Sequence, residues 1–415
     1  MYIHLVKEGK IDTDVHVPSD INKDSYLHTT LFRTGIVFGY PSHFLFIEDK
    51  LKKEWTSDER LKILLFESLY FVYKVEKNKP LDQEFIDTLH EFYAKYHDHS
   101  SLNVLKLLFK ESTEIKVENI LNRRVHIKRT IKNQFWVNYL NNSLVFLDVL
   151  AFHDFLLLDN KLVDSYQHFL SATLYTVGAA SLADGTIDAP EQTLIDVFIS
   201  SANSEDEFTH EFKRKLNAKD IGISDIILPK ECSWLFKLFL TDMAVLTVHS
   251  DLTALDDEMV FLYELCEYFK IDTEQLHNAL MLIERFVIEN NHKVNFLTEQ
   301  SSYEQLYSNF SKRWIKVLGR NKDKFIEELR ESKELISLVN KSISEELSVE
   351  EKEKVKHQFR DLMKSMPAIA IFMLPGGMLL LPIILKIVPN LIPSAFKTNE
   401  IEKSGNEEKG LPKSE

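Results

Sequence analysis

The stretch that decides the fold class is TSDERLKILLFESLYFVYK, residues 56–74. Thr56 and Glu59 form the pattern of a capping box, in which each residue satisfies the other's backbone N–H at a helix start. Apolar residues then recur at helical spacing as far as Val72. A second run with one apolar side covers residues 82–97. These patterns predict long, amphipathic helices.

Composition extends this prediction to the whole chain of 415 residues, which contains only 11 Gly and 11 Pro. A many-stranded sandwich or barrel needs a turn every ~8–12 residues, so helices are favoured. Hydrophobic residues make up 44%, which excludes wholesale disorder. We predict an all-α, multi-domain protein with five parts: an N-terminal helical domain (1–160), a central helical repeat (161–300), a charged helical connector (301–365), a membrane segment (366–396) and a disordered tail (397–415).

Charge and cysteine content narrow the class of protein. The net charge of −14 lacks the positive footprint of a DNA-binding protein. The two cysteines, Cys232 and Cys266, form neither a disulfide framework nor a metal motif, which fits a reducing compartment. The chain contains no Gly-rich phosphate loop, GxSxG or HExxH motif, and we identify no small-molecule substrate. We therefore expect a protein that is not an enzyme.

The C-terminal region contains a long uncharged run, MPAIAIFMLPGGMLLLPIIL, at 366–385. A helix of this length spans ~30 Å, about the thickness of the bilayer hydrocarbon. Basic residues precede the run, so the positive-inside tendency predicts that the bulk of the chain stays in the cytoplasm. Because Pro375, Gly376 and Gly377 interrupt the run, it is a kinked span, the tip of a re-entrant hairpin or, alternatively, a buried core element.

Three prolines, Pro375, Pro382 and Pro389, follow one another at seven-residue spacing, and the motif ends with four further residues: Asn390, Pro393, Ser394 and Phe396. This pattern resembles the membrane segment of LETM1-like proteins, and among these the bacterial LETM1-related biofilm-associated group. The resemblance implies membrane lipid and the ribosome as partners, and the bacterial inner (cytoplasmic) membrane as location. Family members implicated in cation/proton exchange have an acidic residue where this chain has Met378, which argues against transport. In the family a ribosome-binding domain follows the segment, and we expect that domain to be nearly absent here.

The central region contains an approximate internal repeat, in which residues 170–202 align with residues 237–269. Each half has an apolar helix, an acidic turn and a second helix. The first turn, ADGTIDAPE at 183–191, resembles the motif of TerB-like tellurite-resistance domains. The resemblance implies candidate ligands for a divalent cation such as Ca²⁺, Mg²⁺ or Mn²⁺: Asp184, Asp188 and Glu191, with Asp251 and Glu258 in the second turn. Helix capping by Asp188 and Glu191, with an ordinary turn at Asp184, explains every residue of the first turn and is the favoured interpretation.

Two further groups of residues stand out in the sequence, a basic run and a polar pair. The basic run at 123–129 could meet the phosphates of RNA or lipid, or be a solvated helix face. His153 and Asp154 interrupt an apolar stretch and are expected to form a buried polar pair. Our leading hypothesis is a membrane-anchored, LETM1-like binding protein. The alternatives are a protein of cation homeostasis or metal sensing, and a soluble helical scaffold.

Overall fold

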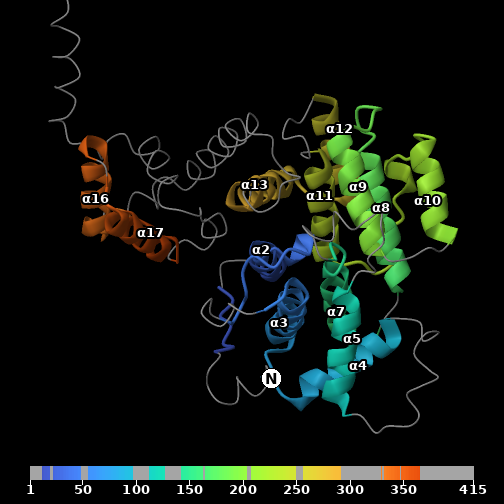
Figure 1. Ribbon diagram of the computed structural model, residues 1–415, viewed down its shortest axis with the longest axis horizontal. Helices are drawn as coiled ribbons and strands as arrows, with labels where there is room; N and C mark the ends of the chain where they lie inside the picture. The colour runs from blue at the N-terminus through green and yellow to red at the C-terminus, as the bar shows by residue number, and fades with distance from the viewer. Residues whose placement is uncertain are drawn as a thin grey trace, which may run out of the picture. The chain divides into compact units, whose positions relative to one another are not determined.

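The computed structural model describes residues 12–18, 22–47, 55–96, 112–126, 142–161, 164–202, 207–248, 256–290, 329, 331–345 and 347–364. The chain divides into two compact units, Met1–Tyr307 and Ser308–Glu415. The described residues contain thirteen α-helices, two 3-10 helices and no strand. The predicted all-α fold is therefore confirmed for this part of the chain (Figure 1).

The apolar run at 366–385 and the tail lie outside the described residues, and so do all the motif residues named above between Pro375 and Phe396. Within the part that the structure describes, no helix combines the length and the hydropathy that crossing a membrane requires. The membrane segment therefore stays a prediction.

The first unit contains eleven of these α-helices. Their bounds are α2 (Lys23–Thr34), α3 (Ser57–Lys77), α4 (Gln83–Tyr96), α5 (Thr113–Val125), α7 (Phe146–Leu157), α8 (Tyr166–Ala180), α9 (Ala189–Ala202), α10 (Glu207–Asn217), α11 (Trp234–Val248), α12 (Asp256–Phe269) and α13 (Thr273–Asn290), with the 3-10 helices η1 (Ile36–Phe38) and η4 (Ile223–Asp225).

Helix α3 begins where the sequence predicts. The Thr56 hydroxyl accepts the backbone N–H of Glu59, and the Glu59 carboxylate accepts the backbone N–H of Thr56, so the capping box is present. One face of α3 packs against α7, whose side chains are buried from Phe146 to Leu156. Aromatic rings fill the space between α4 and α7: the ring of Phe92 lies 5.2 Å from that of Phe152. The apolar stretch that contains His153 and Asp154 therefore belongs to the core.

The helices of the central region repeat as the sequence alignment predicts. Helix α12 begins and ends at the positions that the alignment pairs with the two ends of α9, and α11 corresponds to α8 in the same way to within one position. The two apolar helices, α8 and α11, pack against each other at the centre, and each contacts the second helix of its own copy (Figure 1). Cys266 on α12 is buried in this region, and burial raises the pKa of its thiol to about 12.

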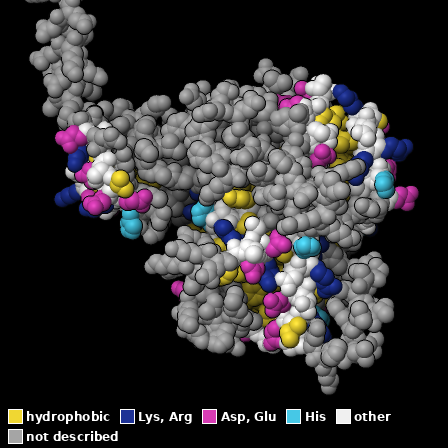
Figure 2. Space-filling view, in the orientation of Figure 1, with side chains coloured by type: hydrophobic (Ala, Val, Ile, Leu, Met, Phe, Trp, Pro, Cys, Tyr) yellow, Lys and Arg dark blue, Asp and Glu magenta, His cyan; other side chains and the backbone are white. Residues whose placement is uncertain are grey.

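The second unit is described by the hairpin of α16 (Lys333–Ser344) and α17 (Val349–Lys364). The backbone N–H of Ser348 donates to Glu351 Oε2 at 2.9 Å and the Ser348 hydroxyl accepts the Glu351 N–H at 3.2 Å, so α17 also begins with a capping box. Leu335, Val355 and Phe359 are buried in the hairpin. Figure 2 shows acidic and basic side chains side by side on its surface.

Candidate functional site

The first acidic turn caps helix α9. The backbone N–H of Glu191 donates to Asp188 Oδ1 at 2.8 Å, and the backbone N–H of Asp188 donates to Glu191 Oε2 at 2.9 Å. Asp184 accepts from the backbone N–H of Thr186 at 2.8 Å, which is an ordinary Asx turn. The capping interpretation of this turn is thus directly observed.

The same turn also holds a buried acid close to other acids, which capping does not explain. Glu191 is 7% exposed, and so is Glu258 in the second acidic turn. Burial, together with the negative charges of Asp188 and Glu258, raises the pKa of Glu191 to about 8. The two predicted turns therefore influence each other electrostatically. Asp251 lies outside the described residues, so cation binding by the full set of five acids stays a prediction.

A second buried charge cluster surrounds Asp148 on α7. Arg124 donates two hydrogen bonds to the Asp148 carboxylate, from Nη2 to Oδ1 at 2.7 Å and from Nε to Oδ2 at 2.8 Å. The Tyr93 hydroxyl donates to Oδ2 at 2.9 Å, and the guanidinium lies over the Tyr166 ring at 4.6 Å. For Arg124 alone this corrects both interpretations of the basic run, because its guanidinium is paired with the buried Asp148. Arg123 is exposed, as the solvated-face interpretation expects. The run ends outside the described residues.

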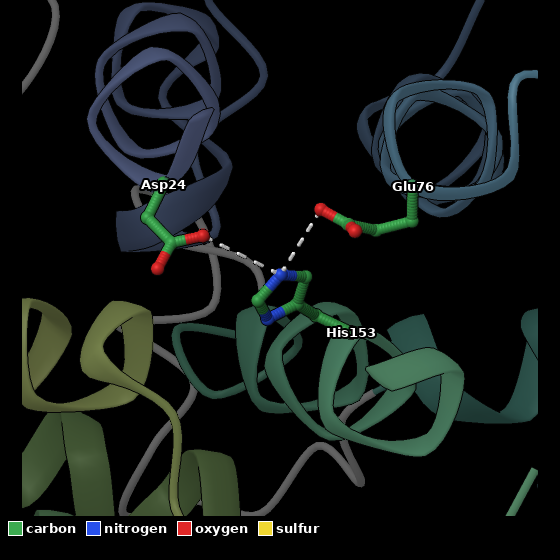
Figure 3. A group of neighbouring side chains, drawn as sticks. All are labelled: Asp24, Glu76 and His153. Atoms are coloured by element: carbon green, nitrogen blue, oxygen red, sulfur yellow. Dashed lines mark ion pairs between the residues drawn. The ribbon is translucent and has the colours of Figure 1, made fainter. Parts of the chain in front are cut away.

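A third cluster is centred on His153, further along α7. Its Nε2 lies 3.5 Å from Glu76 Oε1 and 3.8 Å from Asp24 Oδ1 (Figure 3). Its Nδ1 lies 3.6 Å from Asp154 Oδ1. The His153 side chain is fully buried, and among the described residues neither of its ring nitrogens has a hydrogen-bond partner. The expected buried polar pair is therefore present, but two more acids join it.

The ends of helices α2 and α3 place two of the acids in this cluster. Asn22 caps α2 by accepting the backbone N–H of Asp24 at 2.9 Å, which places the Asp24 carboxylate in the first helical turn. Glu76 lies in the last turn of α3, where the helix dipole disfavours an anion. Lys23 offsets part of that cost, with its Nζ 3.0 Å from Glu76 Oε2.

The pKa values reflect the crowding of these charges. Burial lowers the pKa of His153, but the carboxylates of Asp154 and Glu76 outweigh burial and raise it to about 9. Burial raises the pKa of Asp24. Burial also opposes the charge of Glu76, yet His153 and Lys23 outweigh burial and lower its pKa. A pKa raised this far favours the protonated imidazole at neutral pH.

Of the described residues, Asp24, Glu76 and His153 form the group of three metal-ligating side chains whose ligand atoms all lie within 4.8 Å of one another. Sequence analysis missed Asp24 and Glu76, because the three members of the group lie far apart along the chain, each on a different helix. Only tertiary packing of α2, α3 and α7 brings them together. The one local signal was a histidine inside an apolar helix.

Comparison with protein-family models finds a match between residues 347–413 and the LETM1-like ribosome-binding domain, described as "LETM1-like, RBD". The matched residues begin just before α17 and contain the whole proline-spaced segment. The segment assigned to the membrane lies inside this match. Neither the curated proteins nor the solved structures contain a match.

Proposed function

We propose that the chain is a LETM1-like protein of the bacterial cytoplasmic membrane that acts by binding, without catalysis, and contacts the ribosome through its C-terminal residues. The observation that carries this proposal is the match of residues 347–413 to the LETM1-like ribosome-binding domain. The match supports a family relationship of this segment. Membrane attachment rests on the uncharged run at 366–385.

Helix α17 offers a surface for such contact. Its apolar side is used internally, since Val355 and Phe359 are buried against α16. Lys354 stays exposed, with its side chain 64% accessible to solvent. The helix sequence has five basic residues between 352 and 364, and lysines spaced along a helix can meet successive phosphates of ribosomal RNA. The acidic residues interspersed among them would repel phosphates, so binding would require a ribosomal surface on which the phosphates face the basic residues.

Co-sedimentation of the full chain with purified ribosomes, repeated over a series of salt concentrations, tests the contact. A charge-reversal variant replaces three basic residues of α17 by Glu: Lys352, Lys354 and Lys356. The matched control reverses three basic residues that are exposed in the first unit: Lys213, Arg214 and Lys230. We expect the α17 variant to lose ribosome association by about tenfold or more at physiological salt and the control to keep it. Equal pelleting of parent and α17 variant would contradict the proposal.

Carbonate extraction of membranes tests the anchor separately. The full chain should remain in the membrane pellet, and a version that ends at Lys364 should be released. If both versions are released equally, the apolar run is not an anchor, and the soluble-scaffold alternative replaces the membrane part of the proposal.

A second candidate function is cation homeostasis or metal sensing through the acidic turns. The observation that favours it is the repulsion between Glu191 and Glu258, which a divalent cation would relieve. Calorimetric titration with Ca²⁺, Mg²⁺ and Mn²⁺ compares the parent with the Asp184→Ala, Glu191→Ala double variant. Binding heat that disappears in the variant supports this candidate, and no heat in either protein eliminates it.

A further inference from the structure

Helices α2, α3 and α7 meet at the His153 cluster, where acids from two helices face an imidazole from the third (Figure 3). We propose that Asp24, Glu76 and His153 bind a divalent transition-metal ion, for which Zn²⁺ is the first candidate. This site is separate from the acidic turns and from the C-terminal residues that carry the proposed function.

The separations between the ligand atoms fit a shared ion better than direct bonds. Nε2 of His153 is 3.5 Å from Glu76 Oε1 and 3.8 Å from Asp24 Oδ1, which is too long for hydrogen bonds. Two ligands that bind one tetrahedral Zn²⁺ at ~2.0–2.1 Å lie roughly 3.4 Å apart. All three atoms lie within 4.8 Å of one another, so small side-chain rotations bring each of them onto one ion.

Independent support comes from the buried atoms that lack partners. His153 is fully buried with both ring nitrogens unsatisfied among the described residues, and Glu76 Oε1 is in the same condition. Buried polar atoms in folded proteins are almost always satisfied, because an unsatisfied one costs ~1–3 kcal/mol. A metal ion between Nε2 and the two carboxylates would satisfy Nε2 and Oε1 together.

The far side of the imidazole is also arranged for metal binding. Asp154 Oδ1 lies 3.6 Å from Nδ1 of His153 and is itself without a hydrogen-bond partner among the described residues. In metal sites a ligating histidine commonly donates its second ring N–H to a carboxylate, which orients the ring and makes the ligating nitrogen more basic. Asp154 is positioned for that role.

The charge of the cluster calls for a dication. Among the described residues, the ion pairs of Asp24, Glu76 and Asp154 include one ammonium group, that of Lys23, which leaves two negative charges in these pairs when the imidazole is neutral. A proton on His153 balances one of these charges, whereas a divalent ion balances both. The position of Glu76 in the last turn of α3 adds to the demand for positive charge.

The ligand types select the class of metal. Imidazole favours Zn²⁺, Fe²⁺ and similar ions, whereas Ca²⁺ and Mg²⁺ prefer oxygen ligands alone. An ion can enter past Asp24, whose side chain is 31% exposed while that of Glu76 is 6% exposed. Bound there, the ion would fasten the N-terminal helix α2 to α3 and α7.

The test uses the full chain, freed of metal with a chelator and titrated with Zn²⁺ against a chromophoric competitor. Asp24→Asn removes one ligand charge at a partly exposed position without changing side-chain size, and His153→Gln removes the imidazole. Asp87→Asn on α4, where Asp87 accepts only the Gln83 amide among the described residues, is the matched control. We expect one strong site in the parent and the control, at least tenfold weaker binding in Asp24→Asn, and loss of the site in His153→Gln.

Circular dichroism in the presence of chelator is the control for folding: we expect the spectrum of Asp24→Asn to match that of the parent, so that weaker Zn²⁺ binding reports the site itself. X-ray absorption of the Zn²⁺-loaded parent should show only nitrogen and oxygen ligands, with imidazole scattering. Sulfur in that shell would place the ion on Cys232, and binding that Glu191→Gln abolishes while Asp24→Asn retains it would place it at the acidic turns. Either result overturns the proposal, as does equal or non-saturable Zn²⁺ binding in parent and Asp24→Asn, which would mean an ion-pair cluster only.

Discussion

Helix α7 carries two buried charge clusters close together, and they are built differently. Around Asp148 every contact is short: two bonds from Arg124 at 2.7 and 2.8 Å and one from Tyr93 at 2.9 Å. The ring nitrogens of His153 lie between 3.5 and 3.8 Å from the carboxylates that surround them. The first cluster is complete in itself, whereas the second has the spacing of groups that share a further ligand. Both clusters are buried, so it is the difference in contact lengths that supports the proposal of a bound ion in the second cluster.

The largest expected effect comes from breaking the complete cluster. Asp148→Ala leaves the buried Arg124 guanidinium without its counter-ion, and we expect a loss of about 3–5 kcal/mol in the free energy of unfolding, measured by urea denaturation. Replacing both partners, as Arg124→Met with Asp148→Leu, should cost clearly less because no charge is left buried. If Asp148→Ala has the same free energy of unfolding as the parent, the ion pair does not contribute to stability.

The open cluster should respond to pH instead. The pKa of His153 is raised from 6.5 to about 9, so the contribution of its charged form is complete below pH 6.5 and is lost as pH rises through 9. In the presence of a chelator we expect the parent to lose about 3 kcal/mol more than His153→Gln between pH 6 and pH 9.5. Urea denaturation at the two pH values measures the difference. Parallel behaviour of the two proteins would mean that the carboxylates do not hold the proton.

The acidic turn is an intermediate case, with local caps and a buried charge. The pKa of Glu191 is raised from 4.5 to about 8, so its favourable neutral form is lost as pH rises through 8. Glu191→Gln keeps a capping-box residue and removes the charge. We expect this variant to be more stable than the parent at pH 9, by on the order of 1 kcal/mol because nearby solvent screens part of the repulsion, and equal to it near pH 4. Lower stability of the variant at pH 9 would show that the ionised Glu191 carboxylate is not destabilised by its burial and its acidic neighbours.

Asp184→Ala should have the smallest effect. Asp184 lies near the surface, and its bonds with Thr186 stay inside the turn. We expect the free energy of unfolding to change by about 0.5 kcal/mol or less, as measured by the shift of the thermal midpoint. A larger loss would mean that Asp184 stabilises more than its own turn.

Local patterns predicted the helices well, for physical reasons that particular residues make plain. The capping boxes at Thr56 and Ser348 depend on pairs of residues within one helical turn, so the sequence alone reveals them. The apolar helices of the repeat were visible because α8 and α11 are buried along most of their length. The His153 cluster was not visible, since its acids come from helices whose packing no local pattern specifies. Arg124 looked like part of a surface patch because its partner, Asp148, is distant in the sequence.

The pairing of α8 with α11 implies that neither half of the repeat is a self-sufficient folding unit. Each half would expose an almost wholly apolar helix if it were made alone, and would aggregate or find the missing half. The connection between the copies passes through residues 227–231, where Ile227 is 75% exposed and open to proteolysis. A backbone cut there should leave two fragments that elute together in native gel filtration and separate only in denaturant, so that the chain could be rebuilt from two co-expressed pieces.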